Sequence, residues 1–273
     1  MIKFEKYEVV GLDHAIRGMR NPMNSWDKSD SVWCLFDEDC DEDRVRYCRY
    51  VGGLCVGQND LNLMKKLRAA GTDHRKFMRM MVVYVDITAP LYWWKEFDTY
   101  KVGTVANSCS TMHKIHDKEF TMEDFSCEHL IDSLADEVLE FDPKEMPDDV
   151  TVWADDDTGY LAVTCRGFFH EGHSYEDTLV VSQKDILDMF IIPALNANRE
   201  AYLKSKDKKY WWQMIQLLPT SYNQKRTVML NYEVLANIYK SRKDHKLDEW
   251  RELCKWIEES LPYPELITGK ETE

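Results

Sequence analysis

The chain has 273 residues, of which 35 are Lys or Arg and 49 are Asp or Glu, so its formal charge is −14. An acidic surface repels a nucleic-acid duplex, and the charge therefore argues against a nucleic-acid partner. Apolar residues make up 44% of the chain, enough for a large core, which excludes a chain that is disordered throughout. No apolar run approaches the roughly 20 residues that cross a bilayer, and the N-terminus lacks the apolar stretch of a signal peptide. We expect a cytoplasmic protein without a membrane partner.

The cysteines and histidines do not predict a metal site. Eight cysteines in a chain without a secretion signal are typical of reduced thiols. Four of them are too widely spaced for a structural zinc site: Cys34, Cys40, Cys48 and Cys55. Two histidine pairs have i, i+3 spacing but lack a third ligand: His113/His116 and His170/His173. Glycine loops of the dinucleotide-binding and P-loop types do not occur, which excludes those two nucleotide-binding folds.

The first third of the chain alternates strand and helix signals. Residues 7–10 predict a short strand, and residues 13–20 predict a helix that stops at Asn21-Pro22. Residues 29–57 are rich in aspartate and predict an irregular excursion. Apolar positions on one face predict a helix over 59–70, and a further helix is expected from Asp73 or His74.

Residues 80–87 form the strongest strand signal, because they are nearly all apolar or β-branched, and we expect burial on both faces. Thr88-Ala89-Pro90 predicts a helix start, since proline is tolerated in a first turn. A helix is then expected from Leu91 to about Lys101. Two adjacent tryptophans, Trp93 and Trp94, cannot both face one core. One of them is therefore expected to meet a ligand or another subunit.

An acidic run covers residues 128–157, with a predicted β-hairpin formed by 151–154 and 160–164 around Gly159. We assign about 134–180 to an insertion. Downstream, Ser182 and Asp185 form a capping-box pattern that opens a helix to about Leu203. Three more helices are expected: 208–218, 223–242 and 247–260. The predicted fold class is α+β, mostly helical, with a small central β-sheet and an inserted β-hairpin region.

Residues 87–111 read ITAPLYWWKEFDTYKVGTVANSCST, and here the chain resembles the flavin-dependent thymidylate synthases, the ThyX family. The family motif, R-H-R-x-x-S-x-N-E-x-S-x-R, falls without a gap on Thr99, Tyr100, Lys101, Thr104, Ala106, Asn107, Cys109 and Thr111. Lys101 keeps the charge of an arginine and Thr104 keeps the hydroxyl of the serine, whereas Thr99 and Thr111 replace arginines. Cys109 takes a serine position, where a nucleophile is one interpretation and a buried structural thiol is favoured.

Other segments resemble the family in the same order along the chain. Ala15–Arg20 corresponds to an arginine-bearing first helix, and Leu218-Pro219 and Asn231 recur at the family's separation. Arg242 falls on the arginine that family members direct at the substrate nucleotide. The resemblance implies one ThyX-like domain over residues 1–273, with the acidic insertion, assembled as a homotetramer whose clefts are shared between subunits.

The resemblance also implies roles for individual residues. Arg242 is expected to be catalytic, polarising a pyrimidine ring. Nucleotide binding is assigned to Lys101, Thr104, Ser110, Thr111, Arg226, Asn231 and Arg242. Binding of FAD, the candidate cofactor, is assigned to His74, Trp94, Thr99, Tyr100 and Lys101. The alternative for Lys101, Arg226 and Arg242 is that they are ordinary surface side chains that bind no ligand.

Three functions are compatible with these residues. The first is flavin-dependent methylation or hydroxymethylation of a dUMP-like pyrimidine deoxynucleotide. The second is a non-catalytic protein, of a kind that a phage could encode, that captures or senses a nucleotide. This alternative is motivated by the missing arginines, because each lost charge-assisted contact removes about 1.5–3 kcal/mol of binding energy. The third is a purely structural oligomer that binds no nucleotide.

Overall fold

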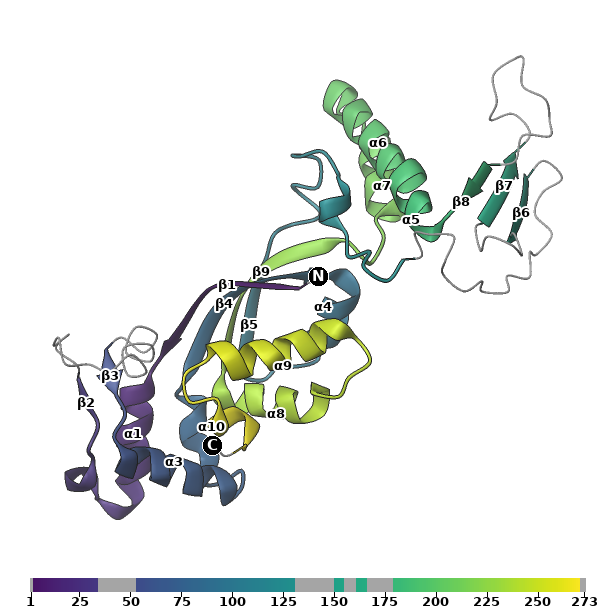
Figure 1. The fold of residues 1–273 in the computed structure, drawn as a ribbon. Helices are drawn as coiled ribbons and strands as arrows, with labels where there is room; N and C mark the ends of the chain where they lie inside the picture. Colours follow the sequence, from purple (N-terminus) through teal and green to yellow (C-terminus); the bar gives the residue numbers. More distant parts are fainter. Residues whose placement is uncertain (1, 34–52, 131–149, 155–160, 166–178, 271–273) are drawn as a thin grey trace, which may run out of the picture. The chain divides into compact units, whose positions relative to one another are not determined.

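The computed structural model describes residues 2–33, 53–130, 150–154, 161–165 and 179–270 (Figure 1). The chain forms two compact units. The first contains residues 1–109 and 223–273, and the second contains residues 110–222. The predicted insertion at about 134–180 lies within the second unit. Each unit is described by itself.

The first unit is built on a four-stranded antiparallel sheet with the strand order β1-β4-β9-β5. Its strands are β1 (Lys3–Val10), β4 (Val82–Pro90), β5 (Thr104–Ser108) and β9 (Asn223–Asn231). β9 pairs with β4 from Val82↔Asn231 to Pro90↔Asn223, and with β5 on its other side. A strand from near the C-terminal end of the chain thus occupies a central place in the sheet.

The predicted helix over 223–242 is wrong in its first half. Residues 223–231 form β9, in which Gln224, Val228 and Leu230 are buried with the period of two that a strand gives. The helix, α8 (Tyr232–Arg242), begins only after Asn231, whose side chain accepts a hydrogen bond from Val234 N at 3.0 Å. This N-cap marks the end of the strand and the start of the helix.

The strand expected at 80–87 is confirmed as β4, with two differences. It runs on to Pro90, through the residues expected to start a helix, and Pro90 sits at the end of the strand pairing. Burial alternates, so that Val83, Val85 and Ile87 are buried while the side chain of Tyr84 is 44% exposed. The prediction of burial on both faces is therefore wrong, and the sheet is covered by helices on one face.

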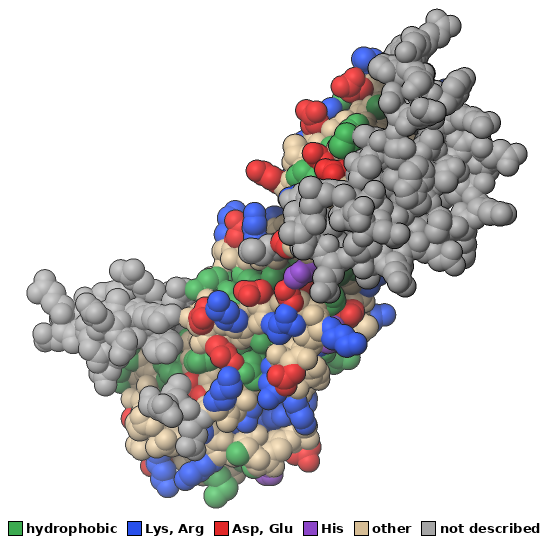
Figure 2. Space-filling model, turned by 45° about the vertical axis from the view of Figure 1, so that its right-hand side comes forward, with side chains coloured by type: hydrophobic (Ala, Val, Ile, Leu, Met, Phe, Trp, Pro, Cys, Tyr) green, Lys and Arg blue, Asp and Glu red, His purple; other side chains and the backbone are tan. Residues whose placement is uncertain are grey.

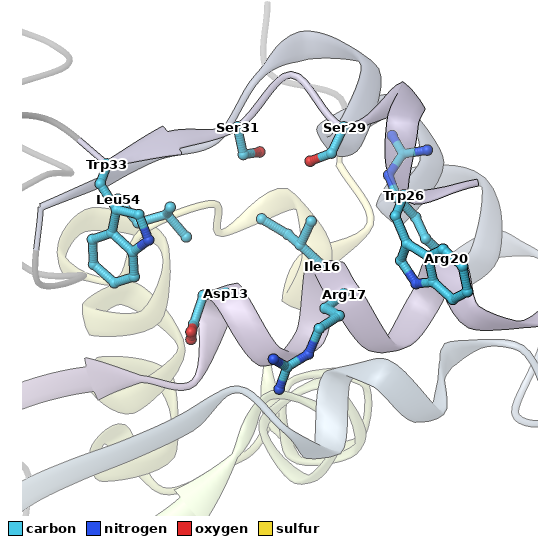
Figure 3. A pocket seen from close by; sticks show the side chains of 9 residues that line it. All are labelled: Asp13, Ile16, Arg17, Arg20, Trp26, Ser29, Ser31, Trp33 and Leu54. Atoms are coloured by element: carbon cyan, nitrogen blue, oxygen red, sulfur yellow. The ribbon is translucent and has the colours of Figure 1, made fainter. Parts of the chain in front are cut away.

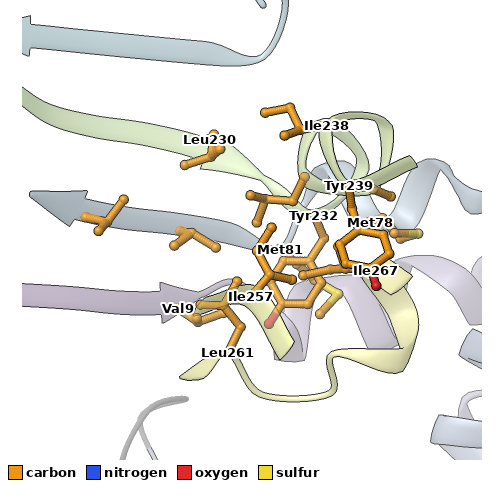
Figure 4. Packing of buried hydrophobic residues seen from close by; sticks show 14 of the residues in the cluster. Val9, Met78, Met81, Leu230, Tyr232, Ile238, Tyr239, Ile257, Leu261 and Ile267 are labelled. Atoms are coloured by element: carbon orange, nitrogen blue, oxygen red, sulfur yellow. The ribbon is translucent and has the colours of Figure 1, made fainter. Parts of the chain in front are cut away.

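The covered face packs against α4 (Leu91–Phe97), α8 and α9 (Asp248–Ser260), as Figure 1 shows. The short helix α10 (Glu265–Thr268) follows. Figure 4 shows part of this core, where Tyr232 from α8 packs with Ile257 from α9 and Met81 beside β4. The hydroxyl of Tyr232 donates a hydrogen bond to Pro262 O at 2.6 Å, so this buried polar group is satisfied.

Both adjacent tryptophans of α4 are core residues, with 0% exposure for Trp93 and 1% for Trp94. Trp93 packs on Trp250 of α9 with 4.8 Å between ring centroids. Trp94 turns toward β9 and donates from Nε1 to Gln224 O at 2.9 Å. The expectation that one of them meets a ligand or another subunit is wrong, because α4 is covered by α9 on one side and by β9 on another.

The N-terminal part adds α1 (Leu12–Arg20), two 3₁₀ turns (Asn21–Met23 and Trp26–Lys28) and α3 (Gln58–Ala69). Within the excursion at 29–57, the described residues form a small two-stranded sheet of β2 (Val32–Trp33) and β3 (Leu54–Cys55). In place of a full helix after Asp73, the chain forms a 3₁₀ helix, Arg75–Arg79. A buried ion pair joins α1 to α3, with Arg20 Nε donating to Asp60 Oδ1 at 2.6 Å.

In the second unit, β6 (Val150–Ala154) pairs antiparallel with β7 (Leu161–Cys165), which confirms the predicted hairpin strands. The turn between them, and the pair His170/His173, lie outside the described residues. β8 (Leu179–Val181) adds a third strand to this sheet. The capping box at Ser182 and Asp185 is confirmed and opens a short helix, α5 (Gln183–Asp185). Also in this unit are a 3₁₀ turn (Met122–Asp124), a π-helical turn (Ile186–Ile191), α6 (Ile192–Ser205) and α7 (Lys208–Leu217).

Charged side chains of both signs are interspersed over the visible face in Figure 2. Within the described ranges, no helix combines the length and the apolar character needed to cross a membrane. The same residues contain no group of three His, Cys, Asp or Glu side chains placed to hold a metal ion.

Candidate functional site

Arg242, at the end of α8, lies in a cluster with side chains from α4 and α9. Its Nη1 donates to Glu96 Oε2 at 2.6 Å, and its Nε donates to Tyr100 OH at 3.0 Å. The guanidinium carbon lies 4.6 Å from the ring centroid of Trp250, whose Nε1 also donates to Glu96 Oε2, at 3.0 Å. Glu96 therefore accepts from both Arg242 and Trp250, and the arginine is held in one orientation.

The cluster is open on one side. The side chain of Arg242 is 19% exposed and that of Glu96 is 35% exposed. Arg242 Nη1 also lies 2.8 Å from His245 Nε2. Among the described residues no group accepts a hydrogen bond from Nη2 of Arg242, so this nitrogen keeps its donors for a ligand. Because Glu96 compensates the arginine's charge, the arrangement suits a neutral acceptor better than a second anion.

Arg226, on β9, is arranged in a similar way. Its guanidinium carbon lies 4.2 Å from the ring centroid of Trp94, and its Nη1 donates to Asp98 Oδ1 at 2.7 Å. Its Nε donates to Gln224 Oε1 at 3.0 Å. The side chain is only 14% exposed. Arg226 therefore covers the edge of the core at Trp94, and its charge is compensated like that of Arg242.

A turn at residues 101–103 precedes β5, which begins at Thr104. Lys101 is exposed and has no carboxylate partner among the described residues. Gly103 has a φ of 75°, and a Cβ there would lie 2.7 Å from Asn231 Nδ2, so this turn needs glycine. The Oγ1 of Thr104 is buried and finds no hydrogen-bond partner in the described part of the chain. Asn231 serves here as the N-cap of α8 and as a neighbour of Gly103.

The remaining predicted site residues are exposed or serve local roles. His74 is exposed before the 3₁₀ helix at 75–79. Thr99 Oγ1 donates to Glu96 O at 2.7 Å, which closes the end of α4. Ser110 and Thr111 belong to the second unit, where Ser110 Oγ accepts from His113 N at 3.0 Å. Cys109 is exposed, so its interpretation as a buried thiol is wrong.

The first helix also borders a cavity of about 270 Å³ (Figure 3). Arg20 is buried at its edge and is fully engaged by Asp60, Ser25 O and Lys28 O. Arg17 is exposed and contacts His14 Nδ1 at 3.0 Å. Of the two arginines of the predicted first-helix motif, Arg20 is therefore structural, and only Arg17 presents its guanidinium to solvent.

Three residues that contact Arg242 or Arg226 were not predicted from the sequence: Glu96 and Trp250 at Arg242, and Asp98 at Arg226. Glu96 and Arg242 are 146 residues apart, and Asp98 and Arg226 are 128 apart, so no local spacing pattern points to either pair. The one local feature that could have pointed to these ion pairs is the presence of two acids, Glu96 and Asp98, shortly after Trp94.

Solved structures with the same architecture are known. ThyX from Helicobacter pylori, crystallised with FAD and dUMP, is 14% identical, with a TM-score of 0.53 over 98% of this chain and 97% of that chain. The chain has a ThyX-like fold. A second structure of the H. pylori enzyme with FAD and dUMP has the same TM-score and identity over 98% of each chain.

A UMP/dUMP methylase, PolB from Streptomyces cacaoi bound with 5-Br dUMP, is 12% identical with a TM-score of 0.47, over 94% of this chain and 88% of that chain. That score is too low to carry an argument. The sequence matches no family model and no curated protein. The ThyX-like fold is therefore assigned from structural similarity.

Proposed function

We propose that this chain binds a pyrimidine deoxynucleotide and that Arg242 contacts the base. The observation that carries the proposal is the Arg242 cluster, in which Glu96 and Tyr100 fix the guanidinium and leave Nη2 available. Two H. pylori structures of the same fold were crystallised with dUMP, which supports a nucleotide of this class. A ring carbonyl, a neutral acceptor, matches an arginine whose charge is already compensated.

The phosphate of the nucleotide needs a cation that is not neutralised within the chain. Lys101 meets this condition, because it is exposed and lacks a carboxylate partner among the described residues. It directly follows Tyr100, whose hydroxyl accepts a hydrogen bond from Arg242, so Lys101 is one residue away from a contact of that arginine. We assign the phosphate contact to Lys101, which offers a point charge in place of an arginine fork.

The residues assigned to FAD fit that cofactor poorly. Trp94 is buried and its ring is covered by Arg226, so it offers no face for an isoalloxazine ring. Thr99 donates its hydroxyl to the backbone of α4, and Lys101 is the one lysine or arginine among the residues assigned to FAD. A dinucleotide's pyrophosphate needs more charge than this. We therefore favour nucleotide capture without flavin chemistry.

Flavin-dependent methylation or hydroxymethylation is the second candidate function. It is favoured by the fold itself, because the H. pylori ThyX structures contain FAD together with dUMP. The absorbance spectrum of the purified protein separates the candidates. A flavin absorbance band that remains with the protein through gel filtration supports flavin-dependent methylation. A colourless protein that also fails to bind added FAD supports nucleotide capture without flavin.

We also propose that the chain assembles as a homotetramer. The uncovered face of the sheet supports this proposal, since it exposes Tyr84 at 44% and Val105 at 60% on either side of Met229 of β9. Exposed apolar groups of this size are typical of an interface. Light scattering at micromolar concentration that detects a monomer would contradict the assembly.

Calorimetric titration with dUMP tests the binding proposal. Arg242→Ala is expected to weaken binding by about 30- to 100-fold, the scale of one lost charge-assisted contact. Arg251→Ala is the matched control, because Arg251 is an exposed arginine of α9 that pairs with Asp248. Equal dUMP affinity for wild type and Arg242→Ala would overturn the proposal.

A further inference from the structure

A cavity of about 500 Å³ lies wholly within the second unit, beside the turn that joins α6 to α7. This volume is in the range of small-molecule sites, roughly 300–1,000 Å³. No aspartate or glutamate lines it, although acids outnumber basic residues in the chain. Its walls carry cations, imidazoles and aromatic rings: Lys206, Lys208, His113, His116, Tyr202 and Trp211.

The walls of the cavity are held by contacts between separate segments. Trp211 Nε1 donates to Met112 O at 2.9 Å, which ties α7 to the segment after β5. Arg199 Nε of α6 donates to His116 O at 3.0 Å. The ring of His116 meets the ring of Tyr202 edge-on, with 4.8 Å between centroids. The cavity is therefore built into the packing of this unit.

The two lysines are positioned over aromatic rings and lack acidic partners. Lys206 Nζ lies 5.6 Å from the centroid of Tyr202, and Lys208 Nζ lies 5.8 Å from that of Trp211. Among the described residues, neither has a carboxylate within ion-pair distance. Nearby lysines behave differently, since Lys204 pairs with Glu200 and Lys209 pairs with Asp207. Two uncompensated ammonium groups beside one cavity attract an anion.

We propose that this cavity binds an organic phosphate. Two ammonium groups supply positive charge and donors for a compact oxyanion with several oxygens, and the imidazole of His113 offers a further ring N–H. The aromatic rings and Met112 give an apolar wall for the organic part of the ligand. The cavity residues all belong to the second unit, and Arg242 belongs to the first, so the inference does not rest on the proposed nucleotide site.

The experiment is calorimetric titration of the full chain with pyrophosphate. Wild type is expected to bind in the submillimolar range at low salt, and the double variant Lys206→Ala/Lys208→Ala is expected to bind at least tenfold more weakly. Lys204→Ala is the matched control, because this lysine of α6 is ion-paired and does not line the cavity.

Amine acylation followed by mass spectrometry locates the bound anion. Pyrophosphate is expected to lower the labelling of Lys206 and Lys208 and to leave Lys204 unchanged. Wild-type binding weaker than about 10 mM would overturn the proposal. Equal pyrophosphate affinity in the double variant would overturn it as well. So would unchanged labelling of both Lys206 and Lys208 in the presence of pyrophosphate. Circular dichroism of the double variant confirms that a loss of binding does not reflect unfolding.

Discussion

Arg242 and Glu96, 146 residues apart in the chain, form an ion pair with 2.6 Å between Nη1 and Oε2. Arg226 and Asp98 repeat the arrangement with 2.7 Å between Nη1 and Oδ1. Each guanidinium also lies over a tryptophan, Trp250 or Trp94. The two acids at the end of α4 thus neutralise both arginines that the resemblance to the ThyX family assigns to nucleotide binding.

Removing the charge of Glu96 tests this neutralisation directly. Glu96→Gln keeps an oxygen acceptor near Arg242 but removes the negative charge that opposes an anionic ligand. We expect dUMP affinity to rise by about tenfold, which corresponds to about 1.4 kcal/mol, as measured by calorimetry. Glu252→Gln, at an exposed position of α9, is the control and should bind like wild type. A lower affinity in Glu96→Gln would show that the negative charge of Glu96 does not oppose the ligand.

Among the acidic residues of the first unit, Asp60 is expected to be the one whose substitution lowers the unfolding free energy most. It is 0% exposed and accepts from Arg20, Ser29 and Ser31. Asp60→Asn leaves the buried Arg20 without a counter-charge, which costs about 3–5 kcal/mol of unfolding free energy. Urea denaturation at pH 7 measures this loss, with the exposed Asp27→Asn as control. A loss below about 1 kcal/mol would contradict the buried ion pair.

The same carboxylate predicts a pH dependence of stability. Burial of Asp60, the largest single effect, raises its pKa, but hydrogen bonds from Ser29, Ser31 and Arg20 and the charge of Arg20 outweigh it and lower the pKa below its usual value. A lowered pKa stabilises the folded state above the unfolded-state pKa of about 3.9, and this contribution disappears as the pH falls through the folded-state value. The difference in unfolding free energy between wild type and Asp60→Asn should therefore shrink below about pH 4.

Cys109 and Cys254 should react very differently with alkylating agents. Burial, with the charges of Glu258 and Asp244, raises the pKa of the Cys254 thiol to about 11, and the side chain is 5% exposed. Cys109 is exposed. Because the thiolate is the reactive form, iodoacetamide at about pH 8 should label Cys109 and spare Cys254 in the folded protein. Mass spectrometry of peptides measures both, and urea-unfolded protein should show equal labelling.

Trp94 is expected to contribute to stability rather than to ligand binding. Trp94→Phe removes the hydrogen bond to Gln224 O and leaves a buried carbonyl without that donor, which costs about 1–3 kcal/mol. Trp212→Phe, at a 42% exposed position, should change unfolding free energy by less than about 0.5 kcal/mol. Thermal and urea unfolding measure both variants. A Trp94→Phe variant that is as stable as wild type but binds dUMP more weakly would show instead that Trp94 belongs to the binding site.

The sequence by itself determined the elements whose signals are local. Apolar periodicity and caps located the helices at Leu12–Arg20, Gln58–Ala69, Lys208–Leu217 and Asp248–Ser260, together with strand β4. Their hydrogen bonds and amphipathic faces are contained in short windows of sequence, so a short window was sufficient to predict them.

Only the tertiary structure decided what residues 223–231 become and what Arg226 and Arg242 contact. That segment is a strand because β4 and β5 pair with it on both sides. Trp93 and Trp94 are both buried because α9 and β9 cover different sides of α4. The arginines are neutralised because Glu96 and Asp98 reach them across the fold. Such pairings depend on which distant segments meet, and that is set by the packing of the whole unit and not by the spacing of residues along the chain.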